Sequence, residues 1–234
     1  MLPLMSNGTV RKSDPKSRRQ PGRPPKLPEH VRRAVVLDAA VRRFAEVGFD
    51  QATVDEIAAA TGVRKPSIYE LFGTKHDLFR AAVEHEVGEL IDFFRVANAE
   101  TSELPLAERT RRRVDAALTR AESNPHGFRL LARARTSWPG GDPDAVREVR
   151  DRLMSVMADN YRRESKAAGT PINAAADLLA RVFFTMADEI IDMRLSDESW
   201  DREALVEFLA SFIEGGMAAI DLDTWQAVER KSHR

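Results

Sequence analysis

The stretch TVDEIAAATGVRKPSIYELFGTK, residues 53–75, contains two short helical patterns separated by a glycine. Thr53 and Glu56 have the spacing of a capping box, in which each side chain bonds to the backbone N–H of the other residue, so a helix begins here. Gly62 supplies the positive φ that a tight turn between helices requires. Pro66 is tolerated only in a first helical turn, which fixes the start of the second helix. The pattern predicts a helix-turn-helix, a motif that reads DNA.

The second helix of this motif has an apolar side and a polar side. Ile68 and Phe72, four residues apart, are expected to point inward. The outward side chains include cations, a hydroxyl and a phenol, which contact phosphates and base edges when a helix lies in the major groove. These side chains are Arg64, Lys65, Ser67 and Tyr69. The alternative is an ordinary helical hairpin whose polar face is solvated.

Flanking segments extend the motif into a small domain. Upstream, apolar residues recur at helical spacing over residues 36–44, and Gly48 followed by Phe49 is typical of a helix C-terminus. Downstream, Gly73 ends the second helix of the motif, and Thr74 can cap the next helix. A plain hairpin does not need these additional elements, so they favour a DNA-reading domain.

In their order and spacing, these residues resemble the N-terminal domain of TetR-family transcriptional regulators. The resemblance covers about 50 residues, from near Arg32 to near Val83, and rests on Leu37, Asp38, Ala39, Ala40, Phe44, Ala45, Glu46, Gly48, Phe49, Thr53, Val54, Ile57, Ala58, Gly62, Val63, Ile68, Tyr69, Phe72, Thr74 and Lys75. It implies operator contacts by Thr53, Lys65, Ser67, Tyr69 and Lys75, with Tyr69 and Lys75 mainly on phosphates. The family often has a small residue where this chain has Pro66. How closely the turn approaches the base edges therefore does not follow from the resemblance.

A basic segment, RRQPGRPPK (residues 18–26), precedes this domain. Its Gly-Arg-Pro core resembles an AT-hook, in which an arginine, here Arg23, enters the narrow minor groove of A·T-rich DNA. Residues 1–34 contain nine of the 36 Lys and Arg residues and two of the 37 Asp and Glu residues, a net charge of +7, which leaves −8 on the rest of the chain. Such an arm can add salt-dependent affinity for DNA. The alternative is a disordered leader whose Gly-Arg-Pro core arises by chance.

The composition indicates an all-α protein. Ala, Leu, Arg and Glu recur at helical spacing, whereas alternating strand patterns are missing. The chain of 234 residues has no cysteine and no apolar run near the ~18 residues that span a membrane, so we expect a cytoplasmic protein without disulfides. The expected units are a disordered basic arm (1–30), a three-helix helix-turn-helix domain (31–80), a helical effector-binding and dimerisation domain (81–225) and a tail (226–234), with about nine helices in total.

The C-terminal part predicts a long fourth helix through Phe94, followed by helices near 105–122, 126–136, 143–168, 173–195 and 201–220. The last two helices have apolar stripes wider than one face, which suggests burial against both their own core and a partner. The alternative is a monomer with a thick core. The resemblance implies that these helices form a dimer interface suited to a two-fold symmetric operator, and the expected interface residues are Phe183, Ile190, Leu209, Phe212 and Gly216.

The resemblance also implies a repressor that a small-molecule effector releases from DNA by changing the spacing of its two reading heads. The candidate lining of the effector site consists of apolar and aromatic residues in the middle helices: Phe93, Phe94, Phe128, Trp138, Met157, Tyr161 and Phe184. The alternative is that most of these residues belong to an ordinary core. Asp188 and Asp192 are interpreted as a solvated helix edge, although they could attract a cationic ligand if they faced inward.

Sequence patterns of enzymes and metal sites are missing. The five histidines are scattered, and none falls in a His-Glu-x-x-His frame. There is no Gly-rich phosphate loop and no Gly-x-Ser-x-Gly elbow. We therefore expect no catalysis, no metal and no cofactor. The rival function is that of a DNA-architectural protein, which would bind A·T-rich DNA without symmetry, mainly through its basic arm.

Overall fold

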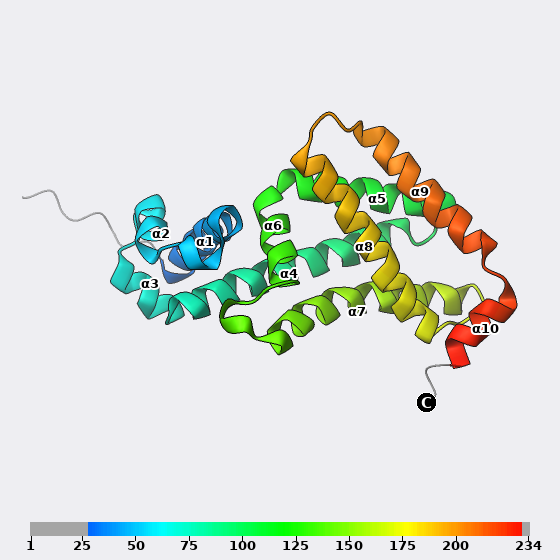
Figure 1. Ribbon diagram of the computed structural model, residues 1–234, viewed down its shortest axis with the longest axis horizontal. Coiled ribbons are helices and arrows are strands. Elements are labelled where there is room, and N and C mark those ends of the chain that lie inside the picture. Colours follow the sequence, from blue (N-terminus) through cyan, green and yellow to red (C-terminus); the bar gives the residue numbers. More distant parts are fainter. Residues whose placement is uncertain (1–27, 231–234) are drawn as a thin grey trace, which may run out of the picture.

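The structure is a computed structural model that describes residues 28–230. The basic arm with Arg23 lies outside this range. The described chain forms ten α-helices and one short 3-10 turn (Figure 1), and the predicted all-α class is confirmed. Within the same range, no helix combines the length and the apolar character that crossing a membrane requires.

Three helices form the N-terminal end of the molecule: α1 (Glu29–Gln51), α2 (Val54–Thr61) and α3 (Lys65–Phe72). Gly48 interrupts α1 with a φ of 79°, which confirms the predicted end of the regular helix. α2 and α3 have eight residues each, whereas isolated helices below ~12–15 residues are only marginally stable. They therefore depend on a common core, in which Phe44, Ile57 and Ile68 are each 1% exposed.

α4 (Lys75–Thr101) connects this end with the rest of the molecule. It begins beside α3 and extends into the C-terminal bundle (Figure 1). The predicted border between residues 80 and 81 therefore falls inside one continuous helix. The remaining elements are α5 (Leu106–Ser123), α6 (Pro125–Ala134), the 3-10 turn η1 (Pro139–Gly141), α7 (Pro143–Ala167), α8 (Ala174–Ser196), α9 (Arg202–Ala219) and α10 (Leu222–Arg230).

One hydrophobic core joins the two ends of the molecule. It combines Val36 of α1 and Phe79 of α4 with Leu130 of α6 and Leu153 of α7. α1 packs against both α4 and α6. A second core, around Leu209 of α9, lies between α5, α8 and α9. Because packed interiors transmit strain, a shift of α4 or α6 reaches α1 directly.

α10 is an addition to the helices that the sequence predicted. Its start is capped by Asp221, whose Oδ1 accepts a hydrogen bond from the N–H of Thr224 (2.7 Å). It lies at the opposite end of the molecule from α1–α3 (Figure 1). The carboxylate of Glu229 accepts hydrogen bonds of 2.8–3.2 Å from the N–H groups of residues 173–175. Residues 226–230 of the predicted tail thus belong to a helix that is attached to the start of α8.

Candidate DNA-binding surface and effector cavity

α2 and α3 form the predicted helix-turn-helix. Gly62 ends α2 with a φ of 67°, and Val63, 7% exposed, fills the space between the helices. Arg64 is the N-cap of α3, and Pro66 lies in its first turn. The turn and the start of both helices therefore lie where the sequence predicts them.

The start of α2 is fixed by three side chains. Thr53 Oγ1 accepts a hydrogen bond from the N–H of Glu56 (3.2 Å), and the carboxylate of Glu56 accepts one from the N–H of Thr53 (3.0 Å). Arg43 of α1 donates to both carboxylate oxygens of Glu56, at 2.6 and 3.2 Å. Hydrogen bonds from Thr53 and then from Arg43 lower the pKa of Glu56. The carboxylate therefore stays ionised and attaches α2 to α1.

The outward face of α3 exposes Arg64 and Tyr69, and Tyr69 is 42% exposed. Lys65 lies at the start of the same helix, where its Nζ donates to Asp55 of α2 (2.8 Å). This hydrogen bond raises the pKa of Lys65 and keeps the side chain cationic. Exposed ion pairs contribute little to stability, so a phosphate can compete with Asp55 for the ammonium group.

The structure corrects the expectation that Ser67 faces outward. Ser67 is only 7% exposed. It lies on the same side of α3 as Leu71, four residues further on and at the edge of the apolar face, where neighbours cover its short side chain. Ser67 is therefore covered in this structure, and the more exposed candidate contacts on α3 are Arg64, Lys65 and Tyr69.

Two other predicted contacts, Thr53 and Lys75, also hold the domain together. The exposed Thr53 belongs to the capping box at the start of α2. Lys75 Nζ lies 4.4 Å from the centre of the Phe49 ring and donates to the carbonyl of Asp50 (3.3 Å). Lys75 thus connects the start of α4 to the end of α1. The predicted minor-groove contact, Arg23, lies outside the described residues.

A cavity of about 1160 Å³ lies in the C-terminal bundle, with walls from α4, α5, α7 and α8. α6 lines it too, and α6 also packs against α1. α9 and α10 contribute further lining residues. The cavity wall includes six of the predicted effector-binding residues: Phe93, Phe94, Phe128, Met157, Tyr161 and Phe184.

Trp138, the seventh predicted effector-binding residue, is not part of the cavity wall. It is 6% exposed, and its ring lies 5.2 Å from that of Phe79 and 6.5 Å from that of His76. Because the chain bends after α6, Trp138 points to the start of α4 rather than into the bundle. Trp138 therefore connects the segment between α6 and α7 to the N-terminal end of the molecule.

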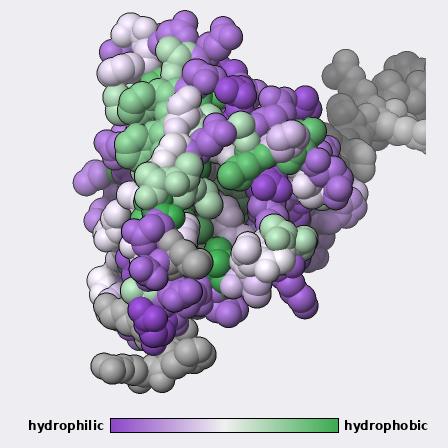
Figure 2. All heavy atoms as spheres, turned by 90° about the vertical axis from the view of Figure 1, so that its right-hand side faces the viewer, coloured by the Kyte–Doolittle hydropathy of each residue, from purple (hydrophilic) through white to green (hydrophobic). Residues whose placement is uncertain are grey.

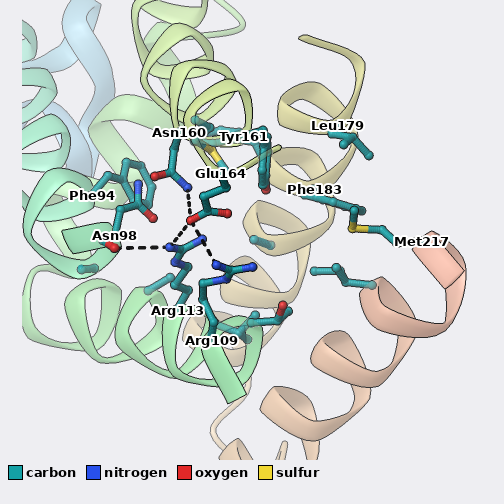
Figure 3. Close-up of a pocket in the computed structure, with 18 of the residues that line it drawn as sticks. Phe94, Asn98, Arg109, Arg113, Asn160, Tyr161, Glu164, Leu179, Phe183 and Met217 are labelled. Carbon is teal, nitrogen blue, oxygen red and sulfur yellow. Dashed lines mark hydrogen bonds and ion pairs between the residues drawn. The ribbon is translucent and has the colours of Figure 1, made fainter. Parts of the chain in front are cut away.

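One part of the cavity wall is polar (Figure 3). Arg113 Nη2 and Asn160 Nδ2 donate to Glu164 Oε1 at 2.6 and 3.0 Å, and Arg109 Nη1 lies 3.8 Å from the same oxygen. Two guanidinium groups thus face one carboxylate. Arg109 Nε is buried without a hydrogen-bond partner among the described residues. Burial raises the pKa of the nearby Tyr161, so its phenol stays neutral.

The structure corrects the interpretation of Asp188 as part of a solvated edge. Its carboxylate accepts a hydrogen bond from Arg135 Nη2 (2.5 Å), and the side chain of Arg135 is only 8% exposed. The guanidinium of Arg135 lies 4.9 Å from the centre of the Phe184 ring. Asp188 and Arg135 both line the cavity, and their charges balance each other. Asp192 is exposed, as interpreted.

The polar groups of the cavity are suited to binding an amphiphile. They are few, partly buried and surrounded by aromatic and aliphatic side chains, which is how small-molecule sites fix the orientation of a ligand. Within residues 28–230, no group of three or more His, Asp or Glu side chains is placed to hold a metal ion.

Known proteins share these features. Residues 36–82 match the family of bacterial regulatory proteins known as the tetR family. The HTH-type transcriptional activator FasR of Mycolicibacterium smegmatis is 25% identical over 197 residues, which cover 84% of this chain and 88% of FasR. A TetR-like transcriptional regulator from Rhodococcus sp. RHA1 superposes with a TM-score of 0.64 at 25% identity, covering 83% of this chain and 100% of the other. Residues 36–82 thus form a TetR-family DNA-binding domain, and the chain is similar to TetR-family transcriptional regulators over most of its length.

A more distant structure shares the TetR fold. It is the transcriptional regulator FadR from Bacillus subtilis, solved in complex with stearoyl-CoA. The two chains are 17% identical and superpose with a TM-score of 0.62, covering 77% of this chain and 96% of FadR. At this identity the likeness is one of fold.

Outside the TetR-family domain, the chain has an exposed apolar face on α8 and α9. On α8, Leu178 and Val182 are 46% and 43% exposed, and on α9, Phe208 and Phe212 are 62% and 57% exposed. The rings of the two phenylalanines stack with their centres 6.2 Å apart. Figure 2 shows a band of apolar side chains along the side of the molecule that α9 occupies. Large exposed apolar patches mark surfaces that bind a partner.

The structure corrects three of the five predicted interface residues. Phe183 lines the cavity and packs against Tyr161, with ring centres 6.0 Å apart. Ile190 and Leu209 are 9% and 1% exposed and belong to the core between α5, α8 and α9. The apolar stripes of α8 and α9 are wider than one face, so the sequence did not fix which row faces outward. Phe212 and Gly216 are exposed, as the predicted interface requires.

The polar residues of the cavity do not stand out in the sequence. Arg109 and Arg113 lie on α5, and Glu164 lies on α7. In the sequence, each of these residues looks like an ordinary surface residue of an amphipathic helix. The helices that cover them in the structure come from distant parts of the chain, so the local pattern does not reveal their burial. The one signal in the sequence is the spacing of Arg109 and Arg113, four residues apart and therefore on one helix face.

Proposed function

We propose that the protein is a dimeric, effector-controlled regulator that binds a two-fold symmetric operator. The observation that carries this proposal is the shared packing: α1 contacts α4 and α6, and both of these helices line the cavity. A ligand in the cavity therefore contacts the same helices that hold the helix-turn-helix. A ligand that binds one arrangement of α4 and α6 more tightly shifts the population toward that arrangement.

In this proposal α3 enters the major groove of the operator. Arg64 and Lys65 lie at the N-terminus of α3, where the helix dipole also favours phosphate. Tyr69 lies one turn further along α3 and bonds to a phosphate. Thr53 and Lys75 flank the motif and contact the backbone of the DNA. Two observations support these roles: the five side chains lie in or directly beside one helix-turn-helix, and Arg64 and Tyr69 are exposed.

The exposed face of α8 and α9 pairs with the same face of a second copy. Burying a Val, Leu or Phe side chain fully is worth about 1.5–3 kcal/mol, and this face holds four such side chains: Leu178, Val182, Phe208 and Phe212. Gly216, on the exposed side of α9, allows a close approach of the two helices. An isologous dimer then presents two α3 helices to two half-sites.

The effector of this proposal has a long apolar body and an anionic head. The aromatic wall around Phe93 and Phe94 suits the body, and Arg109 and Arg113 outnumber Glu164 at the polar part of the wall. A second hollow of about 640 Å³ shares Arg109 and Glu164 with the cavity and adds the guanidinium groups of Arg95 and Arg163.

Long-chain acyl compounds combine these two features. FadR, a protein of the same fold, was solved with stearoyl-CoA, which has an acyl chain and an anionic nucleotide head. We therefore propose a long-chain acyl compound as the effector, with the acyl chain in the cavity and the head near Arg109.

The proposed effector lowers the affinity for the operator. Repression that the effector relieves is the output that the TetR resemblance implies, whereas FasR is named an activator. Both outputs follow from one mechanism, since the position of an operator relative to the promoter determines whether bound protein blocks or assists transcription.

Selection of bound DNA from a randomised duplex pool tests the DNA-binding part of the proposal. The full-length protein is expected to enrich an inverted repeat with a fixed spacing between two half-sites. Enrichment of A·T-rich DNA without symmetry would support the architectural function and contradict the proposal. A pool without any enriched sequence would contradict both functions.

A further inference from the structure

Glu86 is a buried carboxyl group in the cavity wall. It lies on α4 and lines the cavity, and at 6% exposure it is the least exposed charged residue in the described part of the chain. It forms no ion pair with any of the described residues, although the same wall contains Arg113 paired with Glu164 and Arg135 paired with Asp188. A buried carboxyl without a cation is costly and calls for an explanation.

The carboxyl group of Glu86 is only partly engaged. Asn124 Nδ2 donates to Oε2 at 2.8 Å. The amide oxygen of the same Asn124 accepts a hydrogen bond from the N–H of Gly127 (3.0 Å) and so caps α6. A carboxylate can accept about four hydrogen bonds, and among the described residues Asn124 supplies the one that Glu86 receives. Acceptor capacity thus remains on a group that lines the cavity.

Gly127 keeps the space that this arrangement needs. A Cβ at this position would lie 2.1 Å from Glu86 Oε2 and 2.4 Å from Asn124 Nδ2, so an alanine would displace the pair. Gly127 lies in the first turn of α6 and is not one of the glycines with a positive φ, so its backbone conformation does not require glycine. The chain nevertheless has glycine at the point where α6 passes the carboxyl group. The contact between Glu86, Asn124 and α6 is therefore built into the packing.

The electrostatic surroundings favour a hydrogen-bond donor at Glu86. Burial raises the pKa of Glu86. Three influences oppose this effect: the electrostatic interaction with His85, the hydrogen bond from Asn124 and the electrostatic interaction with Arg120. The guanidinium of Arg120 lies 3.9 Å from Glu89 rather than on Glu86. A ligand group that donates to the carboxyl replaces part of the lost hydration and gains a charge-assisted hydrogen bond.

We propose that Glu86 binds a hydrogen-bond-donating group, a hydroxyl or a protonated amine, at the end of the effector opposite its anionic head. This inference rests on the proposed function, in which the cavity holds the effector. Asn98, whose carbonyl bonds to Arg113, lies twelve residues after Glu86 on α4. At 1.5 Å per residue the two positions are about 18 Å apart. An elongated ligand therefore reaches Arg113 with one end and Glu86 with the other.

This position links ligand recognition to the DNA-binding end. Glu86 belongs to α4, Asn124 caps α6, and both helices pack against α1. A ligand donor at Glu86 shares the carboxyl with Asn124 and so changes the contact that joins α4 to α6. Effectors with a terminal donor are therefore expected to release the operator at lower concentrations than effectors of equal length without one.

Three probes of nearly equal length test the inference: hexadecanoate, ω-hydroxyhexadecanoate and ω-methoxyhexadecanoate. The methoxy group accepts hydrogen bonds but cannot donate them, so it isolates donation from polarity. Dissociation constants for the full-length protein are measured by calorimetry, together with the concentration of each probe that releases the operator. The hydroxyl probe is expected to bind about tenfold more tightly than the methoxy probe, as one hydrogen bond to a charged group provides.

Glu86→Gln is the diagnostic variant, and Glu89→Gln is its matched control on the exposed side of α4. Glutamine retains its oxygen for Asn124 and turns an N–H toward the cavity, so the preference for the hydroxyl probe should disappear. Glu89→Gln should retain the preference. Equal affinity of the hydroxyl and methoxy probes for the wild-type protein would overturn the inference, as would a preference that survives Glu86→Gln. If none of the three probes bound, the proposed acyl effector itself would be refuted.

Discussion

The helix-turn-helix end and the cavity-containing end of this molecule are packed in opposite ways. In the first, Phe44, Ile57 and Ile68 are each 1% exposed and fill a core around two very short helices. In the second, four long helices surround a cavity of about 1160 Å³. Protein interiors rarely contain voids larger than a water molecule. The contrast teaches that the DNA-reading end is a filled unit, whereas the bundle contains space that the proposed effector would fill.

The largest expected effect comes from removing one phenylalanine ring at each end. Phe44→Ala should lower the free energy of unfolding by about 3–5 kcal/mol, because it leaves a cavity in a filled core. Phe94→Ala should lower it by about 1 kcal/mol, because this ring is only partly buried beside existing space. Urea unfolding followed by circular dichroism measures both changes. Equal losses would break the contrast between a filled and a hollow end.

The next effect is expected at the proposed dimer face of α8 and α9. Phe212→Glu should halve the sedimentation mass without unfolding the chain, because a charge replaces a side chain that is 57% exposed in the single subunit. Operator affinity should then fall about a hundredfold, since two linked half-site contacts become independent. Val96→Glu is the control, because Val96 is 56% exposed on α4 and away from this face. A Phe212→Glu variant that sediments as a dimer would place the interface elsewhere.

At the DNA-reading end, we expect a smaller effect that is confined to operator binding. Arg64→Ala should weaken operator binding about tenfold and leave effector affinity unchanged, because Arg64 is exposed and forms no part of the core. Ser67→Ala should change operator affinity less, since Ser67 is 7% exposed. Fluorescence anisotropy with labelled operator measures both variants. A larger loss for Ser67→Ala than for Arg64→Ala would contradict the orientation of α3.

The smallest expected effect is a dependence of stability on pH, which arises from Glu86, where α4 meets α6. Burial raises the pKa of its carboxyl in the folded protein above the ordinary value of 4.5, so the folded state takes up a proton more readily than the unfolded chain. As pH falls through the folded pKa toward the unfolded one, the wild-type protein should gain stability relative to Glu86→Gln. Urea midpoints of both proteins across this pH range measure the difference. A loss of relative stability at lower pH would contradict the burial of Glu86.

Much of the DNA-reading end could be predicted from the sequence because its signals are local. Thr53 and Glu56 are three residues apart, and Gly62 and Pro66 act on their own backbone, so the helix starts and the turn follow directly. The orientation of Ser67 could not be predicted in this way, because a short side chain at the edge of an apolar face is buried only when neighbouring helices cover it.

The cavity-containing end could be predicted only in outline. Helix positions followed from breakers such as Asn124-Pro125, but a wide apolar stripe permits several rotations, and Phe183 and Leu209 turned out to face inward. The breakers from Trp138 to Pro143 predicted an interruption after α6 but not its direction, and Trp138 points toward α4. The pair of Glu86 and Asn124 joins positions 38 residues apart, and the contacts that bury such a carboxyl are visible only in three dimensions.

Release of the operator by a ligand in the cavity is the central claim, and a blocked cavity tests it most directly. Ala117 lines the cavity on α5, whereas its neighbour Ala116 does not. Stearoyl-CoA is titrated into operator complexes of the wild-type protein, Ala117→Trp and Ala116→Trp. The wild-type and Ala116→Trp proteins are expected to release the operator, while Ala117→Trp should bind the operator and retain it, because the indole occupies the cavity. Release of all three proteins at the same concentration of stearoyl-CoA would contradict the account.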